Sequence, residues 1–155
     1  MSPHLENSHR RMIRIIAVGK MKNRELASLC AEYEKRLGRY DKAQVLELKD
    51  AGAAQEGTRI LEALDACRGR VYVLSEEGSA FTSKAFSAAL EADMQNGPSV
   101  FVIGGPYGLD DRVKRRADVL MSISPMTFTH EWARAILMEQ LYRAKSISAG
   151  SGYHH

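Results

Sequence analysis

The feature that most constrains the fold is a regular alternation of short apolar runs with stretches of helical periodicity. Five runs are rich in Val, Ile and Leu and are bounded by glycine or polar residues: 13–18, 45–48, 71–74, 100–103 and 119–123. Most are continuously apolar, which is typical of parallel strands buried on both faces of a sheet. Because a helical stretch separates each run from the next, we expect an α/β fold, with a mostly parallel sheet flanked by helices.

The helical stretches between these runs have recognisable ends. We expect helices at about 26–37, 60–64, 83–94, 111–117 and 130–146, and a loop at 51–57. Gly38 is a natural stop for the first helix, and either Thr82 or Ser83 can cap the third. The last helix is the longest and carries an apolar face.

Length and composition indicate one globular domain. At 155 residues and 45% hydrophobic content, the chain can bury a proper core. Residues 1–11 are polar and lack periodicity, so we expect a disordered extension before a domain at 12–155. No apolar run has the roughly 18 residues needed to span a bilayer, and no signal peptide is evident. Cys30 and Cys67 are expected to be buried, reduced thiols of a cytoplasmic protein.

The distribution of charge is more informative than its net value of +3. Basic residues form three clusters: Arg10, Arg11, Arg14, Lys20, Lys22 and Arg24; Arg112, Lys114, Arg115 and Arg116; and Arg143, Lys145, His154 and His155. No acidic residue follows Glu139. Three such clusters favour a polyanionic partner, although a solvated helix face is the commoner cause of any single cluster.

Three strands run into unusual loops, at 75–79, 104–108 and 124–129. In a parallel sheet, ligands bind beyond the carboxyl ends of the strands. Gly104 and Gly105 would let the backbone approach a ligand, but neither a P-loop nor the G-x-G-x-x-G spacing is present, and a tight turn remains possible. The loop at 124–129 suits an adenosine-like group, or it is a plain connector with Thr129 as the helix cap. No zinc or serine-hydrolase pattern occurs, so we expect no metal site.

The chain ends in I-S-A-G-S-G-Y-H-H. Such an end is often frayed, or a remnant of a purification tag. The alternative is a flexible arm that carries chemistry.

Several motifs, in collinear order, resemble one family. They are M-I-R-I-I-A-V-G-K-M-K from Met12, Y-E-K-R-L from Tyr33, F-V-I-G-G-P-Y-G-L from Phe101, M-T-F from Met126, H-E-W-A-R from His130, E-Q-L-Y-R-A from Glu139, and the closing Y-H. The stretch from Met12 to His154 resembles the bacterial ribosomal RNA large subunit methyltransferase H family, the 23S rRNA pseudouridine N3-methyltransferases of the SPOUT class.

This resemblance implies a C-terminal trefoil knot, a homodimer, and S-adenosylmethionine bound within the knot. It also implies methylation of N3 of a pseudouridine in 23S rRNA of the assembled ribosome. The cofactor-binding residues carried over are Leu74, Gly104, Ile123, Ser124, Pro125, Met126, Thr127 and Phe128. They fall on the same three loops.

In this interpretation the C-terminal tail, residues 147–155, takes part in catalysis. Methyl transfer to a ring nitrogen needs alignment and removal of a proton, and His154 is the candidate base. Tyr153 would stack on the target base or donate a hydrogen bond to its carbonyl, and Arg134 and Arg143 would hold phosphates or the negative charge that develops on the ring. The expected RNA contacts are Arg143, Lys145 and His155. Ion pairing of Arg134 and Arg143 with Glu139 or with a dimer partner is an equally good interpretation.

The chain departs from the family pattern in three places. His155 stands where the family usually has Lys or Arg, Thr129 stands where proline is common, and residues 1–11 have no counterpart. Two other functions compete with the enzyme: a non-catalytic, ribosome-associated RNA-binding protein, and a nucleotide-dependent oxidoreductase, which the glycine spacing disfavours.

Overall fold

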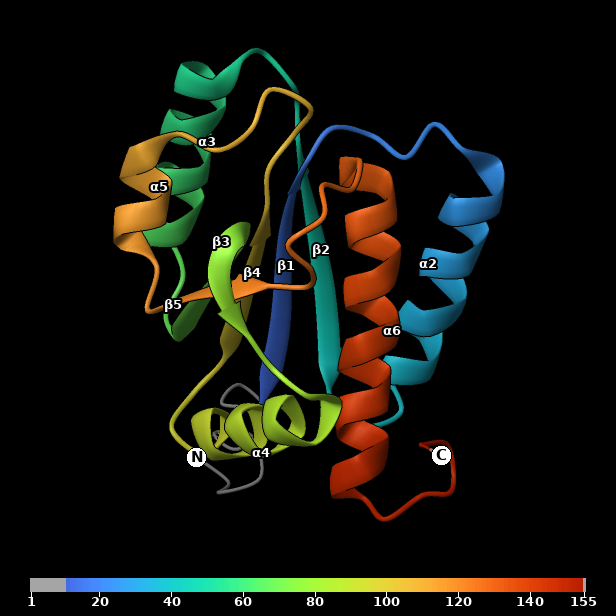
Figure 1. Ribbon diagram of the computed structural model, residues 1–155. Helices are drawn as coiled ribbons and strands as arrows, with labels where there is room; N and C mark the ends of the chain where they lie inside the picture. The colour runs from blue at the N-terminus through green and yellow to red at the C-terminus, as the bar shows by residue number, and fades with distance from the viewer. Residues whose placement is uncertain (1–10, 155) are drawn as a thin grey trace, which may run out of the picture.

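A single five-stranded parallel sheet organises the computed structural model, which describes residues 11–154. The strands are β1 (Met12–Val18), β2 (Lys42–Leu48), β3 (Arg70–Ala80), β4 (Ser99–Ile103) and β5 (Val119–Ser122), in the order β2-β1-β4-β3-β5. Every pair of neighbours is parallel. The α/β prediction is confirmed (Figure 1), and the knotted crossing of the chain stays a prediction.

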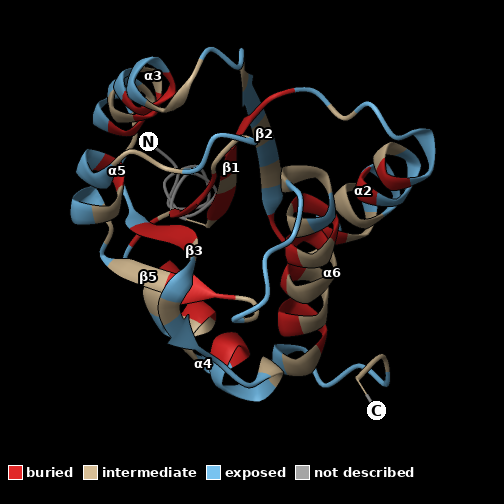
Figure 2. Ribbon diagram, turned by 45° about the horizontal axis from the view of Figure 1, so that its top comes forward, coloured by how far each residue is buried: buried red, intermediate tan, exposed pale blue. Residues whose placement is uncertain are grey.

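Helices cover both faces of this sheet. They are α2 (Arg24–Leu37), α3 (Ala53–Asp65), α4 (Ser83–Met94), α5 (Asp111–Arg116) and α6 (His130–Ser148). Helices α2, α4 and α6 pack on one face, and α3 and α5 pack on the other. Each helix turns its buried side toward the sheet (Figure 2). Within residues 11–154, no helix is both long and apolar enough to cross a bilayer.

Strand β1 shows why the apolar runs are continuous. Ile13 and Ile15 belong to the core beneath α2, α4 and α6. Ile16 and Val18 belong to the core beneath α3 and α5. Successive side chains of a strand point to opposite faces, so a strand covered on both faces is apolar at every position. The edge strand β2 instead alternates between half-buried and exposed residues.

The predicted loop at 51–57 is wrong, because α3 begins at Ala53. The Oε2 atom of Glu56 accepts hydrogen bonds from the backbone N–H groups of Ala51 (2.9 Å) and Gly52 (2.8 Å) and so closes the start of the helix. Gly57 lies against α5, since a Cβ atom there would come within 2.6 Å of Asp110 Cβ. The small residues that suggest a loop therefore serve helix packing.

The predicted loop at 75–79 is also only partly right, because β3 continues to Ala80. Its pairing with β5 shifts register between Leu74 and Ser79, so residues 75–78 bulge out of the ladder. Gly78 lies directly against the backbone of Leu120, where a side chain would collide. The bulge brings this segment to the same edge as the other strand ends.

Arg11, the residue directly before the predicted domain boundary at Met12, contacts the folded domain. Arg11 forms ion pairs with Asp41 (3.1 Å) and Glu91 (3.4 Å). The rest of the predicted extension, residues 1–10, lies outside the described residues. Of the two cysteines, Cys30 is buried as expected, whereas Cys67 is only half-buried.

Lys145 on α6 is almost fully buried, with 3% of its surface exposed. Its Nζ atom lies 2.6 Å from Asp41 Oδ2 and also pairs with Glu91. Burial alone would raise the pKa of Glu91, but the hydrogen bond and charge of Lys145 hold this pKa below its ordinary value. The side chain therefore joins α6 to α4 and to the start of β2.

Replacing Lys145 with Ala should lower the free energy of unfolding by about 3–5 kcal/mol, because it leaves two carboxylates without their buried partner. Urea denaturation followed by circular dichroism measures the change. The control is Lys84→Ala on the exposed surface of α4, which should change stability by less than about 0.5 kcal/mol. Equal stability of the two variants would contradict a structural role for Lys145.

Candidate functional site

A cleft of about 1150 Å³ lies where three loops meet beyond the strand ends. Its walls come from the β3 bulge, from the loop between β4 and α5, and from the segment between β5 and α6. All eight cofactor-binding residues predicted from the sequence line it: Leu74, Gly104, Ile123, Ser124, Pro125, Met126, Thr127 and Phe128. The structure therefore brings together residues that are up to 54 positions apart in the chain.

The glycine-rich loop, residues 104–108, packs tightly against neighbouring side chains. A Cβ atom on Gly104 would come within 2.8 Å of the Leu109 side chain, and one on Gly105 within 2.9 Å of Val18 Cγ1. A hydrogen bond of 3.1 Å from Gly108 N–H to the Gly105 carbonyl closes the turn. The backbone of Gly104 and Gly105 therefore forms part of the cleft wall beside the side chains of this loop, and a ligand can approach it closely there.

The segment between β5 and α6 is held by its own hydroxyl groups. The Met126 N–H donates to Ser124 Oγ (3.0 Å), and Thr127 Oγ1 donates to Glu76 Oε2 on the β3 bulge (2.8 Å). Met126 is 73% exposed and Phe128 is 40% exposed. The segment therefore offers apolar side chains beside fixed polar groups, as a binding site for an amphipathic small molecule requires.

Thr129 caps α6, as one interpretation of the sequence expects. Its Oγ1 atom accepts a hydrogen bond of 3.4 Å from the Trp132 N–H. Thr129 also lines the cleft. Thr129 therefore caps the helix and also forms part of the cleft wall, so the two interpretations of this loop do not exclude each other.

The N-terminal end of α6 closes one side of the cleft. Glu131 accepts hydrogen bonds from the backbone N–H groups of Lys22 and Asn23, and the bond from Asn23, together with that from Lys22, holds the Glu131 pKa below its ordinary value. His130 Nε2 would lie 3.2 Å from a Cβ atom on Gly19, which has φ +88°. The basic segment after β1 is thereby fixed near the cleft.

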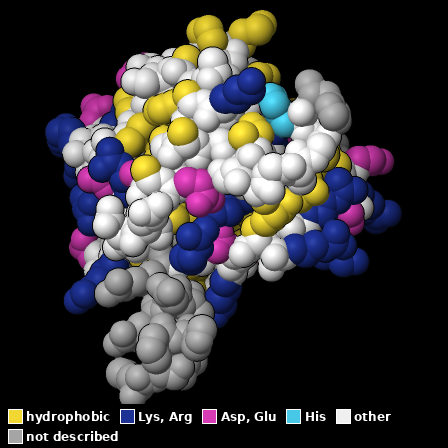
Figure 3. All heavy atoms as spheres, turned by 90° about the horizontal axis from the view of Figure 1, so that it is seen from below, with side chains coloured by type: hydrophobic (Ala, Val, Ile, Leu, Met, Phe, Trp, Pro, Cys, Tyr) yellow, Lys and Arg dark blue, Asp and Glu magenta, His cyan; other side chains and the backbone are white. Residues whose placement is uncertain are grey.

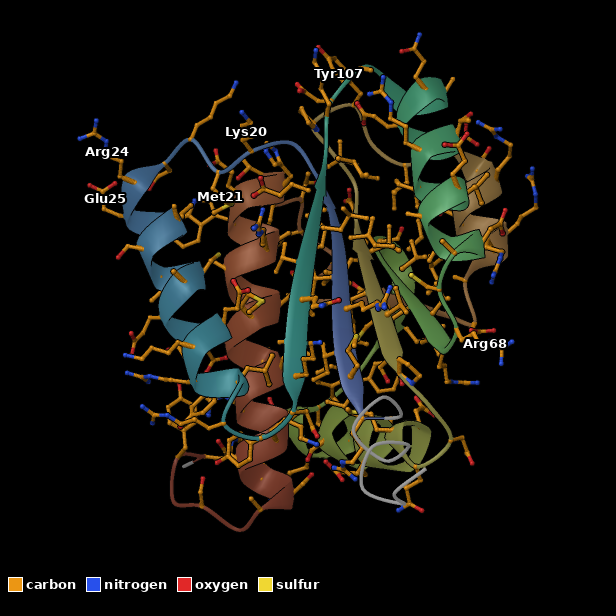
Figure 4. All side chains as sticks on the ribbon, turned by 180° about the vertical axis from the view of Figure 1, so that it is seen from behind. Lys20, Met21, Arg24, Glu25, Arg68 and Tyr107 are labelled. Atoms are coloured by element: carbon orange, nitrogen blue, oxygen red, sulfur yellow. The ribbon has the colours of Figure 1, made fainter. Side chains whose placement is uncertain are left out.

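Lys20 and Tyr107 project at the same end of the molecule, whereas Arg68 lies away from it (Figure 4). Tyr107 lines the cleft and is 69% exposed. Sequence reasoning missed the carboxylates of Glu76, Glu77 and Glu131 and the His130 ring, all of which line the cleft. Glu76 and Glu77 follow the apolar run 71–74, and His130 and Glu131 begin α6. Positions of this kind indicated the other lining residues.

The predicted catalytic tail does not lie at this cleft. His154 Nδ1 lies 3.0 Å from an Arg143 guanidinium nitrogen, far along α6. Arg143 is 13 residues after His130, which at 1.5 Å per residue separates them by about 20 Å along the helix. Figure 1 shows the C-terminus at the end of α6 opposite to the loops. The fold of the chain thus separates the two predicted parts of the site.

Two of the predicted basic site residues are buried instead of facing RNA or a target base. Arg134 is 9% exposed and does not line the cleft; its guanidinium lies 2.7 Å from Glu47 on β2. This is an ion pair, as the alternative interpretation expects, but its partner is Glu47 and not Glu139 or a dimer partner. Lys145 is enclosed by Asp41 and Glu91, so in this structure its Nζ atom does not face solvent where RNA could contact it. Both lie on the inward side of α6, where charge is retained only by pairing.

Arg143 is half-buried and its pKa is raised, first by hydrogen bonds to Glu139, which lies 2.5 Å away. This pair also fits the ion-pairing alternative. His155, the third predicted RNA contact, lies outside the described residues.

Two other surface regions are weaker candidates for a functional site. A hollow of about 610 Å³ on the outer side of α2 is lined by Arg24, Glu25, Ser28, Leu29 and Glu32, none of which was predicted as a site residue. The face at the amino ends of the strands interleaves basic and acidic side chains (Figure 3). Neither region combines apolar walls with the converging loops of the cleft.

Known proteins match this chain along nearly all its length. The family described as "Predicted SPOUT methyltransferase" matches residues 12–154. The ribosomal RNA large subunit methyltransferase H of Oleidesulfovibrio alaskensis is 43% identical, over 94% of this chain and 99% of that protein. The protein of the same name from Leuconostoc mesenteroides is also 43% identical, over 92% and 98%.

The fold has a counterpart among solved structures. A probable methyltransferase from Bordetella pertussis Tohama I superposes with a TM-score of 0.54 at 12% identity, over 90% of this chain and 96% of that one. At this identity the likeness concerns the fold alone. The matched family and the closely similar relatives confirm the resemblance found in the sequence: the chain belongs to the SPOUT methyltransferase family, in the group of the ribosomal RNA large subunit methyltransferase H proteins.

Proposed function

We propose that this chain transfers a methyl group from S-adenosylmethionine to large-subunit ribosomal RNA in the cytoplasm. The finer assignment is N3 of a pseudouridine in 23S rRNA of the assembled ribosome. The observation that carries the proposal is the single cleft lined by all eight predicted cofactor residues. The relatives that share over 40% of their residues with this chain carry names for the same activity.

The cleft fits the proposed cofactor. Ile123, Met126 and Phe128 provide apolar walls for an adenine ring, and the backbone of the Gly104 loop provides polar groups at close range. Glu76 and Glu77 place carboxylates at the same cleft, which suits a ligand that carries positive charge. S-adenosylmethionine supplies the electrophilic methyl group, and the residues of this chain supply binding and alignment.

The tail has a defined hydrogen-bonding state in this structure. The guanidinium of Arg143 can only donate, so Nδ1 of His154 accepts and the neutral ring carries its proton on Nε2. In this position His154 donates to a carbonyl oxygen of the target base and stabilises negative charge on its ring. It becomes a base only when its contact with Arg143 breaks.

Tail and cleft come together only if two protomers combine. The length of α6 keeps them apart in one chain, so we assign the tail of one protomer to the cleft of its partner in a homodimer. Trp132 is 53% exposed at the cleft end of α6, and Met126 and Phe128 are exposed nearby in the chain. Exposed apolar side chains of this kind suit a dimer interface.

The RNA would reach the cleft along the basic segment after β1. Lys20, Lys22 and Arg24 are exposed there, and the backbone of Lys22 is fixed by Glu131. Arg143 on α6 and His155 of the tail are further RNA contacts in this proposal.

Replacing Gly104 with Val should weaken S-adenosylmethionine binding about tenfold or more, because the new side chain has no space beside Leu109. Isothermal titration calorimetry measures the dissociation constant. The control is Gly38→Ala at the end of α2, where a Cβ atom makes only ordinary contacts. Unchanged affinity in the Gly104 variant would place the cofactor elsewhere.

Deleting Tyr153 to His155 should lower kcat for ribosome methylation about 100-fold, the usual effect of losing a polar catalytic group. Affinity for S-adenosylmethionine should stay within about twofold of the full chain, because these residues do not line the described cleft. Transfer of labelled methyl groups to ribosomes that lack the modification gives the rate. Full activity of the truncated protein would remove the tail from the mechanism.

Mixing the two impaired variants tests the shared site, at an S-adenosylmethionine concentration that fills the wild-type cleft but not the Gly104→Val cleft. Subunit exchange between the tail deletion and Gly104→Val should restore about a quarter of wild-type activity, because half of the dimers are mixed and each has one complete site. Each variant alone, taken through the same exchange, is the control. If the mixture stays inactive although mixed dimers form, each protomer builds its own site.

A further inference from the structure

The chain reverses direction after α6 and returns along the same helix. Gly150, with φ +70°, makes the turn, and the N–H groups of Gly150 and Ser151 bond to the carbonyls of Ile147 (3.1 Å) and Ser146 (3.0 Å). This is a regular helix end with a left-handed residue. It directs Tyr153 onto α6 and α2, so the tail has a specific docking place.

Three residues receive the Tyr153 side chain, and we call Tyr33, Glu139 and Tyr142 the tail socket. The Tyr153 hydroxyl lies 3.1 Å from the Tyr33 hydroxyl and 3.2 Å from Glu139 Oε1. The Tyr153 ring meets the Tyr142 ring edge-on, with centroids 4.7 Å apart. One side chain is thus held by two hydrogen bonds and an aromatic contact.

The same contacts determine where Arg143 and His154 lie. The Arg143 guanidinium lies 4.9 Å from the centroid of the Tyr153 ring and bonds to Glu139. Its remaining terminal nitrogen, NH1, contacts His154 Nδ1 at 3.0 Å. The position of His154 therefore depends on Tyr153 through Arg143.

Tyr33 is the part of the socket that comes from another helix. It lies on α2, 120 positions before Tyr153, and its ring centroid is 5.9 Å from that of Tyr142. Glu139 accepts, so Tyr153 donates to Glu139 and its oxygen accepts the Tyr33 proton. Burial and the Glu139 charge raise the pKa of Tyr153, which keeps its hydroxyl protonated for this pattern.

We propose that Tyr33 is a positioning residue for the methyl transfer, which fixes Tyr153 through its hydroxyl and so holds His154 in one orientation at the partner's cleft. This inference rests on the proposed function, because it assumes that the tail acts in catalysis. Tyr33 itself acts through the tail and does not touch the reacting atoms.

The competing explanation is that the socket only adds stability to the end of the chain. The two explanations differ in what the hydroxyl of Tyr33 controls. Tyr33→Phe keeps the ring and its packing on Tyr142 but removes the hydrogen bond to Tyr153. Loss of one such bond shifts the equilibrium between docked and undocked tail about 3- to 10-fold.

The test is Tyr33→Phe in the full chain, assayed on ribosomes with saturating S-adenosylmethionine. We expect kcat to fall about 3- to 10-fold, with the cofactor dissociation constant unchanged within twofold. We also expect carboxypeptidase to release Tyr153 from the free protein about 3- to 10-fold faster, since the tail undocks more often. Unchanged kcat together with an unchanged release rate would overturn the proposal.

The matched control is Tyr40→Phe. The Tyr40 ring also packs on Tyr142, with centroids 6.1 Å apart, but its hydroxyl faces Ser146 at 3.4 Å rather than the tail. This variant should keep both kcat and the release rate. An equal loss of kcat in both variants would show that the tyrosines act on general stability, and the positioning role would be wrong.

A double-mutant cycle with Tyr153→Phe separates this inference from the proposed function. If Tyr33 acts through the hydroxyl of Tyr153, Tyr33→Phe should have no further effect on kcat in the Tyr153→Phe background. A full further loss would contradict the proposal. If deletion of the tail leaves methylation intact, the proposed role of the tail fails, whereas faster tail release in Tyr33→Phe would still show the docking contact.

Discussion

The structure depends on burial of one parallel sheet between two layers of helices. This burial makes β1, β4 and residues 71–74 of β3 apolar at nearly every position, so most of the polar and glycine residues follow the ends of these apolar runs. Since parallel strands end at one edge, the loops that follow them converge there. The cleft at Gly104 and Met126 is a consequence of that constraint.

The sequence predicted the parts of the fold that follow from this constraint. The five apolar runs became strands, and Thr82 and Thr129 cap the helices expected after them. The loop at 51–57 was misjudged because its helix start depends on Glu56, whose bonds to Ala51 and Gly52 are invisible in a pattern of small residues. Hydrogen bonds between a side chain and the backbone decide such cases.

Residues of the candidate site could be predicted where their position at the end of a strand places them. They could not be predicted where the position of a side chain depends on a partner distant in sequence. Leu74, Gly104 and Met126 line the cleft as expected. Arg134 and Lys145 look like surface charges on α6, yet Glu47, Asp41 and Glu91 neutralise them inside the protein. The tail socket likewise joins Tyr33 and Tyr153, which no local pattern connects.

The central claim is that the three loops form one S-adenosylmethionine site, completed by the tail of a second protomer. A crystal structure of the protein with S-adenosylmethionine tests it most directly. The account predicts adenosine density between Gly104 and Phe128, with Tyr153 and His154 of the other protomer at the mouth of the cleft. Cofactor density elsewhere, or a cleft approached by no tail of a second protomer, would contradict it.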